Sequence, residues 1–293
     1  MRSLLFVPAD GGSKLDKALA SGADAVIIDL EDSITPERKE FARAAAATFL
    51  KEAVARAARP RLLVRTNGLD TGLIDADLDA IVPSWPDAIL LPKAEGGASV
   101  IHTDAKLTAR EAISGLAEGH IKIVAQAIET AAAIFQIGTF SGSSERLIGM
   151  TWGPEDLSAE VGAEANRDSQ GRLTEPYRLA RSLCLFGAAG AAVAAIETVY
   201  VDFRNLDGLR RDTEEGRRDG FSGRLAIHPA QVAVINEVFT PTADALAKAR
   251  AIVEAFATAP GAGAIGIEGK MYDRPHLVRA QQLIARAKPA GLS

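Results

Sequence analysis

Charged side chains directly follow most of the short apolar segments in this sequence. In chain order these side chains, together with the titratable His228, are Asp29, Glu31, Asp32, Arg65, Lys93, Glu129, Asp156, Asp202 and His228. A charged group is costly in apolar surroundings unless it is paired or binds a metal ion. If the apolar segments are parallel strands, these groups gather at one edge of the sheet, which predicts a polar site there.

Two of these carboxylates, Glu129 and Asp156, are candidate metal ligands. The four histidines are widely spread and Cys184 is the single cysteine, so the sequence offers neither a zinc cluster nor an internal disulfide. Carboxylate ligands favour a hard cation, and we therefore predict Mg²⁺, with Mn²⁺ as a substitute. Each residue also has a structural alternative: Glu129 as a charge stabilised by a helix dipole, and Asp156 as an N-cap.

The basic residues of the predicted site also allow two interpretations each. Arg65 can hold a substrate carboxylate through two parallel hydrogen bonds, or it can form an ion pair with Asp29 or Glu31. Lys93 could be the Schiff-base lysine of a metal-independent aldolase, which requires a lowered pKa. We favour the alternative, in which Lys93 pairs with a carboxylate at the same edge.

The apolar segments are short, rich in β-branched residues and bounded by turn residues, as is typical of buried parallel strands. We predict strands at Ser3–Pro8, Ala25–Leu30, Arg61–Arg65, Ala88–Leu91, Lys122–Ile128, Arg146–Met150, Glu197–Val201 and Arg224–Ile227. Helical segments lie between them, such as Lys14–Ser21, Pro36–Ala58, Leu73–Val82, Ala98–Ala117, Glu129–Phe140 and Glu175–Gly190. This alternation predicts an α/β fold, a (β/α)8 TIM barrel, with the charged residues at its C-terminal mouth. An open doubly wound sheet is the rival, but no glycine-rich dinucleotide motif follows the first strand.

We assign residues 1–239 to the barrel and residues 240–293 to a C-terminal extension. Within the extension, a helix opens at Thr240-Pro241 and ends at about Phe256, and a flexible Gly-rich stretch covers residues 260–269. A final helix spans about His276–Ala287. We predict that the extension is a Gly-hinged lid, with a ragged tail as the alternative.

Composition excludes several classes of protein. The 293 residues are 47% hydrophobic and 24% charged, as in an ordinary globular chain, and their net charge is −5. An acidic chain without a basic run is a poor candidate for binding nucleic acid or an anionic membrane. The sequence has no signal-peptide pattern and no apolar run of membrane-spanning length, so we expect a cytoplasmic protein.

Several motifs along the whole chain are similar to those of one family. They are Arg2-Ser3-Leu4-Leu5-Phe6-Val7-Pro8, Asp29-Leu30-Glu31-Asp32-Ser33, Val64-Arg65-Thr66-Asn67, Leu91-Pro92-Lys93, Glu129-Thr130-Ala131, Gly153-Pro154-Glu155-Asp156-Leu157, Ala226-Ile227-His228-Pro229 and Gly269-Lys270-Met271-Tyr272-Asp273-Arg274-Pro275. In this order they resemble the citrate lyase beta-subunit-like family of the HpcH/HpaI aldolase superfamily. The resemblance implies a Mg²⁺-dependent (β/α)8 barrel, usually a homotrimer or hexamer. It also implies cleavage or formation of a carbon–carbon bond between a CoA-thioester enolate and a 2-oxo acid, as in malyl-, citramalyl- and citryl-CoA lyases.

The same resemblance implies roles for individual residues. Glu129 and Asp156 match the metal ligands, and Arg65 matches the arginine that holds the 2-oxo acid. Glu31 and Asp32 match an acidic pair that supports the site and the substrate. Asp273 matches a lid aspartate, which we take as the catalytic acid–base and which enters the site of a neighbouring subunit; its alternative is an N-cap of the final helix.

One departure from the family pattern affects the predicted partner. Many members have Gly-Asn-Arg-Pro after the first strand, and its arginine helps to bind CoA, whereas this chain has Ala9-Asp10-Gly11-Gly12. Lys14 and Lys17 could supply the missing charge. Two alternatives therefore stay open: a Mg²⁺-dependent aldolase acting on a free 2-oxo-4-hydroxy acid, and a citrate lyase complex subunit that needs an acyl-carrier partner.

Overall fold

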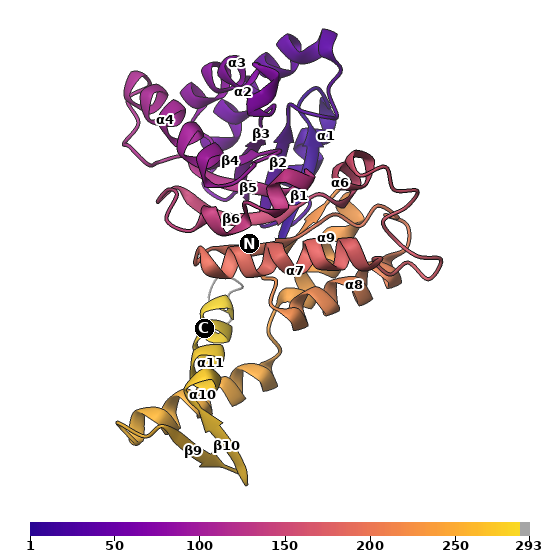
Figure 1. The fold of residues 1–293 in the computed structure, drawn as a ribbon. Helices are drawn as coiled ribbons and strands as arrows, with labels where there is room; N and C mark the ends of the chain where they lie inside the picture. Colours follow the sequence, from indigo (N-terminus) through magenta and orange to yellow (C-terminus); the bar gives the residue numbers. More distant parts are fainter. Residues whose placement is uncertain (288–293) are drawn as a thin grey trace. The chain divides into compact units, whose positions relative to one another are not determined.

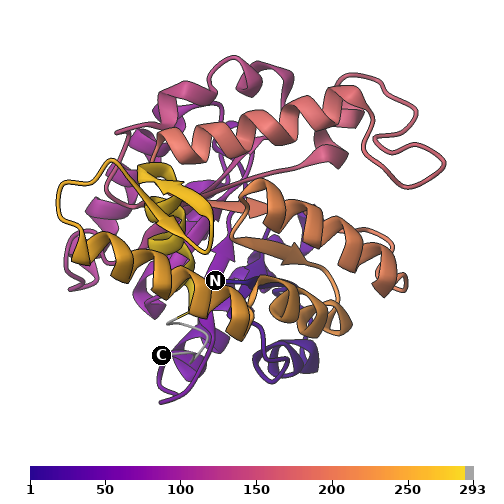
Figure 2. The ribbon, with the colours of Figure 1, turned by 90° about the horizontal axis from the view of Figure 1, so that it is seen from below.

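Eight parallel strands form a closed barrel in the computed structural model, which describes residues 1–287 (Figures 1 and 2). Each strand pairs with the next in the chain, and β8 closes the barrel against β1. The strands are β1 Ser3–Pro8, β2 Ala25–Asp29, β3 Arg61–Arg65, β4 Ala88–Leu91, β5 Lys122–Ile128, β6 Leu147–Trp152, β7 Ala194–Glu197 and β8 Gly223–Ala226. The predicted (β/α)8 barrel is confirmed.

Helices follow the strands and cover the outside of the barrel (Figure 2). They are α1 Ser13–Leu19, α2 Lys39–Val54, α3 Ile74–Ile81, α4 Gly97–Ile113, α5 Ala131–Ile134, α6 Pro154–Glu160, α7 Glu175–Gly190, α8 Leu206–Asp219 and α9 Pro229–Phe239. One apolar cluster, which includes Leu4, Ile27, Leu63, Leu90 and Val124, takes side chains from every second position of the strands. This alternation fills the barrel interior and leaves the charged residues to the strand ends.

Two of the predicted strands are placed wrongly. The sixth begins at Leu147 and runs to Trp152, beyond the predicted end at Met150. The seventh is Ala194–Glu197, so Glu197 ends the strand instead of beginning it, and Asp202 lies five residues beyond the barrel edge. The prediction followed the strand-like residues after Glu197, because Ala194 and Ala195 are poor strand formers on their own.

The chain divides into two compact units, one ending at Asn236 and one beginning at Glu237. In the second unit, α10 Ala243–Thr258 is followed by the antiparallel strands β9 Ala264–Ile267 and β10 Lys270–Asp273 and by α11 Arg274–Ala287. The Gly-rich stretch, which the sequence predicts to be flexible, therefore contains the hairpin strand β9. Its two-residue turn, Glu268-Gly269, has positive φ at both positions, as tight hairpins require.

The second unit has its own apolar core, formed by α10, α11 and the hairpin, with Phe256, Tyr272 and Ala280 among its buried residues. Within residues 1–287, no helix combines the length and the apolar character needed to cross a membrane.

Candidate functional site

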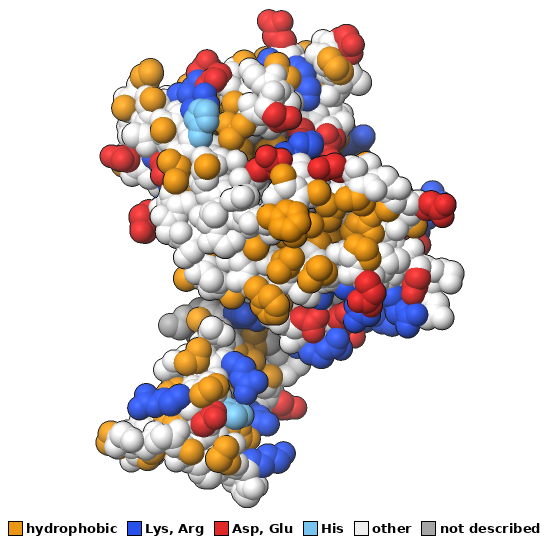
Figure 3. Space-filling view, viewed as in Figure 1, with side chains coloured by type: hydrophobic (Ala, Val, Ile, Leu, Met, Phe, Trp, Pro, Cys, Tyr) orange, Lys and Arg blue, Asp and Glu red, His pale blue; other side chains and the backbone are white. Residues whose placement is uncertain are grey.

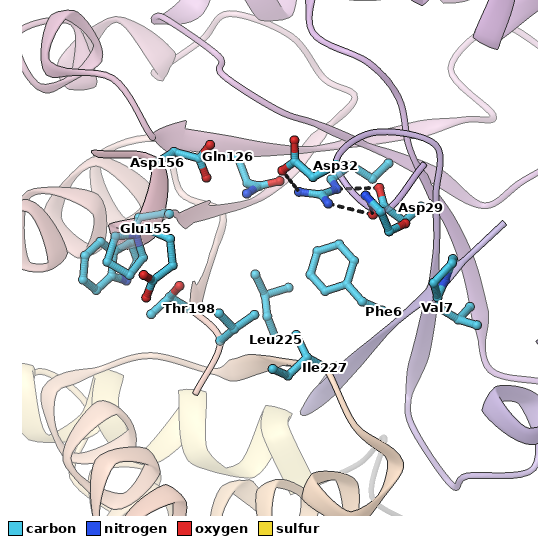
Figure 4. A pocket seen from close by; sticks show the side chains of 17 residues that line it. Phe6, Val7, Asp29, Asp32, Gln126, Glu155, Asp156, Thr198, Leu225 and Ile227 are labelled. Carbon is cyan, nitrogen blue, oxygen red and sulfur yellow. Dashed lines mark hydrogen bonds and ion pairs between the residues drawn. The ribbon is translucent and has the colours of Figure 1, made fainter. Parts of the chain in front are cut away.

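A cavity of about 460 Å³ opens at the C-terminal mouth of the barrel (Figure 4). Its walls come from the ends of β1, β2, β3, β5, β6, β7 and β8 and from the loops that follow them. Polar side chains, including Asp29, Asp32, Gln126 and Asp156, lie on one side, whereas Phe6, Leu225 and Ile227 lie on the other (Figure 4). The cavity can therefore receive a ligand with one charged and one apolar part.

Arg65, at the end of β3, is bound on three sides by carboxylates. Its Nε and Nη2 each donate to Asp29, at 2.7 Å, and its Nη1 lies 2.9 Å from Glu31 Oε2 and 3.3 Å from Asp32 Oδ2. The guanidinium also lies over the Phe6 ring, 4.9 Å from its centroid. Of the two predicted roles, the structure shows the ion pair, because the bidentate face of Arg65 is taken by Asp29. Arg65 is also one of the residues that line the cavity.

Asp29 is the buried anchor of this arrangement. Burial alone would raise the pKa of Asp29, but the hydrogen bonds and charge of Arg65 outweigh it and lower the pKa. Asp29 also accepts hydrogen bonds from the backbone N–H groups of Glu31 and Ser33, which fixes the loop after β2. Arg65 is therefore held in one orientation before any substrate arrives.

Glu129 follows β5 and is almost completely buried, with 1% of its surface exposed. Its Oε1 accepts from Gln126 Nε2 and its Oε2 accepts from the backbone N–H of Lys93, both at 2.6 Å. Burial raises the pKa of Glu129 to about 8; the Lys93 N–H opposes this, and the nearby charges of Asp156 and Glu31 add to it. A carboxylate in this position favours binding a proton or a metal cation.

Asp156 lies in the first turn of α6, which begins directly after β6 with Gly153 as the N-cap and Pro154 at its first position. The alternative role predicted for Asp156, as the N-cap of a helix, is therefore wrong. A Cβ at Gly153 would lie 2.7 Å from Glu129 Oε1, so the absence of a side chain there lets this loop approach Glu129 closely. The Asp156 side chain is 34% exposed and faces the cavity (Figure 4).

The residues present fit a magnesium ion bound by Glu129 and Asp156. Both offer hard oxygen ligands, and Gln126 Oε1 is buried beside Glu129 with no hydrogen-bond partner in the described part of the chain. In residues 1–287, no three histidine, cysteine or acidic side chains are arranged so that they could hold a metal ion together. Mg²⁺ usually takes one or two protein carboxylates and completes its shell with substrate and water, so a two-carboxylate site is adequate for it.

Glu31 and Lys93 form the second ion pair of the mouth. Lys93 Nζ lies 2.6 Å from Glu31 Oε1 and 3.7 Å from Asp156 Oδ1. Burial alone would lower the pKa of Lys93, but the hydrogen bond and charge of Glu31 raise it above its ordinary value. This direction is opposite to the one that a Schiff-base lysine requires.

Asp273 lies in the second unit, at the end of β10 and directly before α11. Its carboxylate contacts His276 Nδ1, and this hydrogen bond lowers the pKa of Asp273. The placement at the start of the helix matches the capping alternative. The role of Asp273 as the acid–base therefore stays a prediction.

Gln126 and Trp152 also place polar groups at the cavity, and neither is among the predicted site residues. Gln126 binds Glu129, and a polar residue inside the apolar fifth strand, three positions before Glu129, was a signal for it. Trp152 is buried at the cavity wall, where its Nε1 donates to Glu197 Oε1 at 2.8 Å. Glu197, misassigned to the beginning of its strand, is itself held by Arg181 at 2.6 Å.

Comparison with known proteins agrees with this architecture. The sequence profile of the HpcH/HpaI aldolase/citrate lyase family matches residues 2–229, and that of a carbon–carbon bond lyase of the TIM-barrel fold matches residues 168–292. The chain belongs to the HpcH/HpaI aldolase/citrate lyase family. The predicted resemblance is confirmed, and so is its assignment to the carbon–carbon lyases.

Individual family members are similar over nearly their whole length. A (3S)-malyl-CoA thioesterase of Cereibacter sphaeroides is 35% identical over 289 residues, which cover 98% of this chain and 94% of that protein. The citrate lyase subunit beta of Leuconostoc mesenteroides is 31% identical over 290 residues, covering 98% and 93%.

Solved structures of the family show the same fold. CitE from Mycobacterium tuberculosis, in complex with magnesium, acetoacetate and coenzyme A, is similar with a TM-score of 0.77 and 30% identity over 98% of both chains. RipC from Yersinia pestis has a TM-score of 0.67 and 31% identity, covering 83% of this chain and 97% of its own. The magnesium in the CitE complex agrees with the cofactor predicted from the sequence.

Proposed function

We propose that this protein is a Mg²⁺-dependent lyase that cleaves or forms a 3-hydroxyacyl-CoA thioester, such as malyl-, citramalyl- or citryl-CoA. The products of cleavage are an acyl-CoA, such as acetyl-CoA, and a 2-oxo acid. The observation that carries this proposal is that the charges of Glu129 and Asp156 lie close enough to interact, at the mouth of a barrel of this family where Arg65 lines the same cavity as Asp156. The magnesium and coenzyme A of the similar CitE complex support it.

Each residue of the mouth has a distinct part in this reaction. Glu129 and Asp156 would hold the magnesium ion, which supplies a Lewis acid and orients the substrate oxygens. Arg65 Nη1 presents a positive charge to the oxygen on which negative charge develops. Glu31 and Asp32 flank Arg65 and hold that edge beside the substrate.

In cleavage, the substrate hydroxyl loses its proton, its oxygen forms the carbonyl of the 2-oxo acid, and the adjacent carbon–carbon bond breaks. The electron pair of that bond leaves with the thioester as an enolate, whose carbon must then take up a proton. We assign both proton transfers to Asp273: its ionised carboxylate takes the hydroxyl proton and then donates that proton to the enolate carbon. In the reverse reaction the same carboxylate removes the α-proton, and its lowered pKa keeps it ionised for that purpose.

We further propose that the protein is a homotrimer or hexamer in which Asp273 serves the barrel of a neighbouring subunit. Exposed apolar side chains gather on α7 and at the end of α5, which favours association between copies (Figure 3). They include Leu179, Phe186 and Phe135, which are 60%, 67% and 85% exposed.

An assay of the purified protein alone tests the proposal. We expect malyl-, citramalyl- or citryl-CoA to be converted with Mg²⁺ into an acyl-CoA and a 2-oxo acid. Activity on a free 2-oxo-4-hydroxy acid but on no CoA thioester would favour the aldolase alternative. Activity only with an added acyl-carrier protein would favour a subunit of a citrate lyase complex.

Hydrolysis of the thioester is a second candidate reaction, because one similar protein is a thioesterase. The Cereibacter sphaeroides relative is a malyl-CoA thioesterase, so hydrolysis of the thioester is a competing outcome for this chain. Product analysis with malyl-CoA separates the two reactions. A lyase releases acetyl-CoA and glyoxylate, whereas a thioesterase releases free CoA and malate.

A further inference from the structure

Lys93 has an unusual backbone conformation directly after the fourth strand. It follows β4 and Pro92, and its φ of 48° lies in the left-handed region, which a residue with a side chain rarely adopts. Such strain persists only where the surroundings hold it in place, and it is concentrated at functional sites.

This conformation directs both ends of Lys93 at the acidic residues of the mouth. Its backbone N–H donates to Glu129 Oε2 at 2.6 Å, and its Nζ lies 2.6 Å from Glu31 Oε1 and 3.7 Å from Asp156 Oδ1. One residue thus contacts three carboxylates, two of which are the metal ligands of the proposed function. The Lys93 side chain is 30% exposed, so the ammonium lies at the mouth and not deep in the barrel.

We propose that Lys93 is a positioning residue whose ammonium competes with the divalent cation, holding the site together without metal and keeping its affinity for free Mg²⁺ low. This inference rests on the proposed function, because it takes Glu129 and Asp156 as the ligands. An ammonium 3.7 Å from Asp156 Oδ1 would repel a dication bound to the same carboxylate. An anionic substrate contributes negative charge of its own, so Mg²⁺ binds tightly only together with that substrate.

The competition can be measured as metal binding without catalysis. We expect the Kd of Mg²⁺ alone, measured by isothermal titration calorimetry with substrate-free protein, to be at least tenfold lower for Lys93→Met than for the wild type. With pyruvate present as a 2-oxo acid probe, the difference between the two proteins is expected to shrink.

Two further variants separate the ammonium from other effects. Lys93→Gly also removes the ammonium but relieves the left-handed backbone, so we expect tightened Mg²⁺ binding with a higher Tm than that of Lys93→Met. Lys106→Met is the control for net charge, because Lys106 is on α4 and pairs with Asp75 at 2.8 Å, outside the mouth. Its Kd for Mg²⁺ should equal that of the wild type.

If the wild type binds Mg²⁺ and both Lys93 variants bind it with equal or weaker affinity, the inference about Lys93 is wrong. The proposed function is not affected by that result. Absence of Mg²⁺ binding from the wild type and from the variants, with and without pyruvate, would overturn the metal assignment of the proposed function and this inference with it.

Discussion

Replacing Arg65 by lysine keeps the positive charge at the barrel mouth but removes the planar fork. In the structure that fork makes two hydrogen bonds of 2.7 Å to Asp29, and its third nitrogen faces Glu31 at 2.9 Å. A lysine ammonium can replace at most one of the bonds to Asp29, and it cannot reach Glu31 in the same geometry. The Asp29 carboxylate, only 3% exposed, is then left with an incomplete set of partners.

The size of the effect follows from these contacts. A hydrogen bond to a charged group contributes about 1.5–3 kcal/mol, so the loss of one such bond and the weakening of another should lower the free energy of unfolding by about 2–4 kcal/mol. If Arg65 also stabilises charge in the transition state, a misplaced cation should lower kcat/KM by about 10²–10³-fold, as the loss of a comparable donor does elsewhere.

Arg59→Lys provides a matched control. Arg59 forms the same two-bond pair with Asp87, at 2.5 and 3.0 Å, just before the same strand begins. This pair is more exposed, at 20% and 28% of the two side chains, so its loss should cost about 1 kcal/mol or less and leave kcat/KM unchanged.

Urea unfolding and steady-state kinetics on both variants decide the question. Kinetics are measured well below the Tm of each variant, so that unfolding does not contribute. Near-normal kcat/KM for Arg65→Lys would show that Arg65 is only a structural ion-pair partner. Equal stability losses in the two variants would refute the reasoning from burial.

Three other substitutions and the removal of Mg²⁺ test the metal site, the role of Asp273 and a buried ion pair. Asp156→Ala should abolish turnover, as should removal of Mg²⁺ with a chelator, while circular dichroism shows an intact fold; full activity of metal-free enzyme would refute the metal mechanism. Asp273→Asn should lower kcat by about 10²–10⁴-fold with little change in Tm, and mixing it with Asp156→Ala should restore some activity if the lid serves a neighbour. Asparagine caps a helix about as well as aspartate, so a pure capping role predicts that Asp273→Asn leaves both the rate and the Tm unchanged, whereas Asp273→Ala would cost about 0.5–2 kcal/mol of stability. Glu111→Gln should cost about 3 kcal/mol at pH 7, because it breaks a buried pair in which Arg146 makes two bonds of 2.7 Å. Burial alone would raise the pKa of Glu111, but Arg146 outweighs it and lowers the pKa, so this stability is present above the ordinary glutamate pKa and is lost as the pH falls through the lowered value. Chemical denaturation should therefore show a smaller difference in the free energy of unfolding between Glu111→Gln and the wild type below pH 4 than at pH 7.

Much of the barrel could be predicted from the sequence, because its strands are buried on both faces and their apolar runs end at charged residues. The bounds of β1, β3, β4 and β5 agree with the structure. The seventh strand could not be placed in the same way. Its residues Ala194 and Ala195 have no strand preference, and only its pairing with β6 and β8 makes them a strand.

The position of the candidate site could be predicted from the sequence, but the ion pairs between its charged residues could not. Charge after a strand end predicts that Arg65, Glu31 and Lys93 share one mouth, and it cannot say which of them pair. Arg65 had two compatible roles, and only the register of β2 against β3, which sets Asp29 opposite Arg65, decides for the ion pair. The place of Asp273 on β10 could not be predicted either, because the Gly-rich sequence before it does not indicate a β-hairpin.

The ion pairs at the barrel mouth give a physical reason for a divalent cation there. Asp29 pairs with Arg65 and Glu31 pairs with Lys93 at close range, whereas Glu129 accepts hydrogen bonds only from the Gln126 amide and a backbone N–H among the described residues. Buried carboxylates are costly without a compensating charge, and the raised pKa of Glu129 expresses that cost. A dication bound by Glu129 and Asp156 together would offset this cost more fully than the single ammonium of Lys93, which lies beside Glu31. We therefore expect this site to bind the metal, and under our proposal Lys93 sets how strongly Mg²⁺ binds before the substrate arrives.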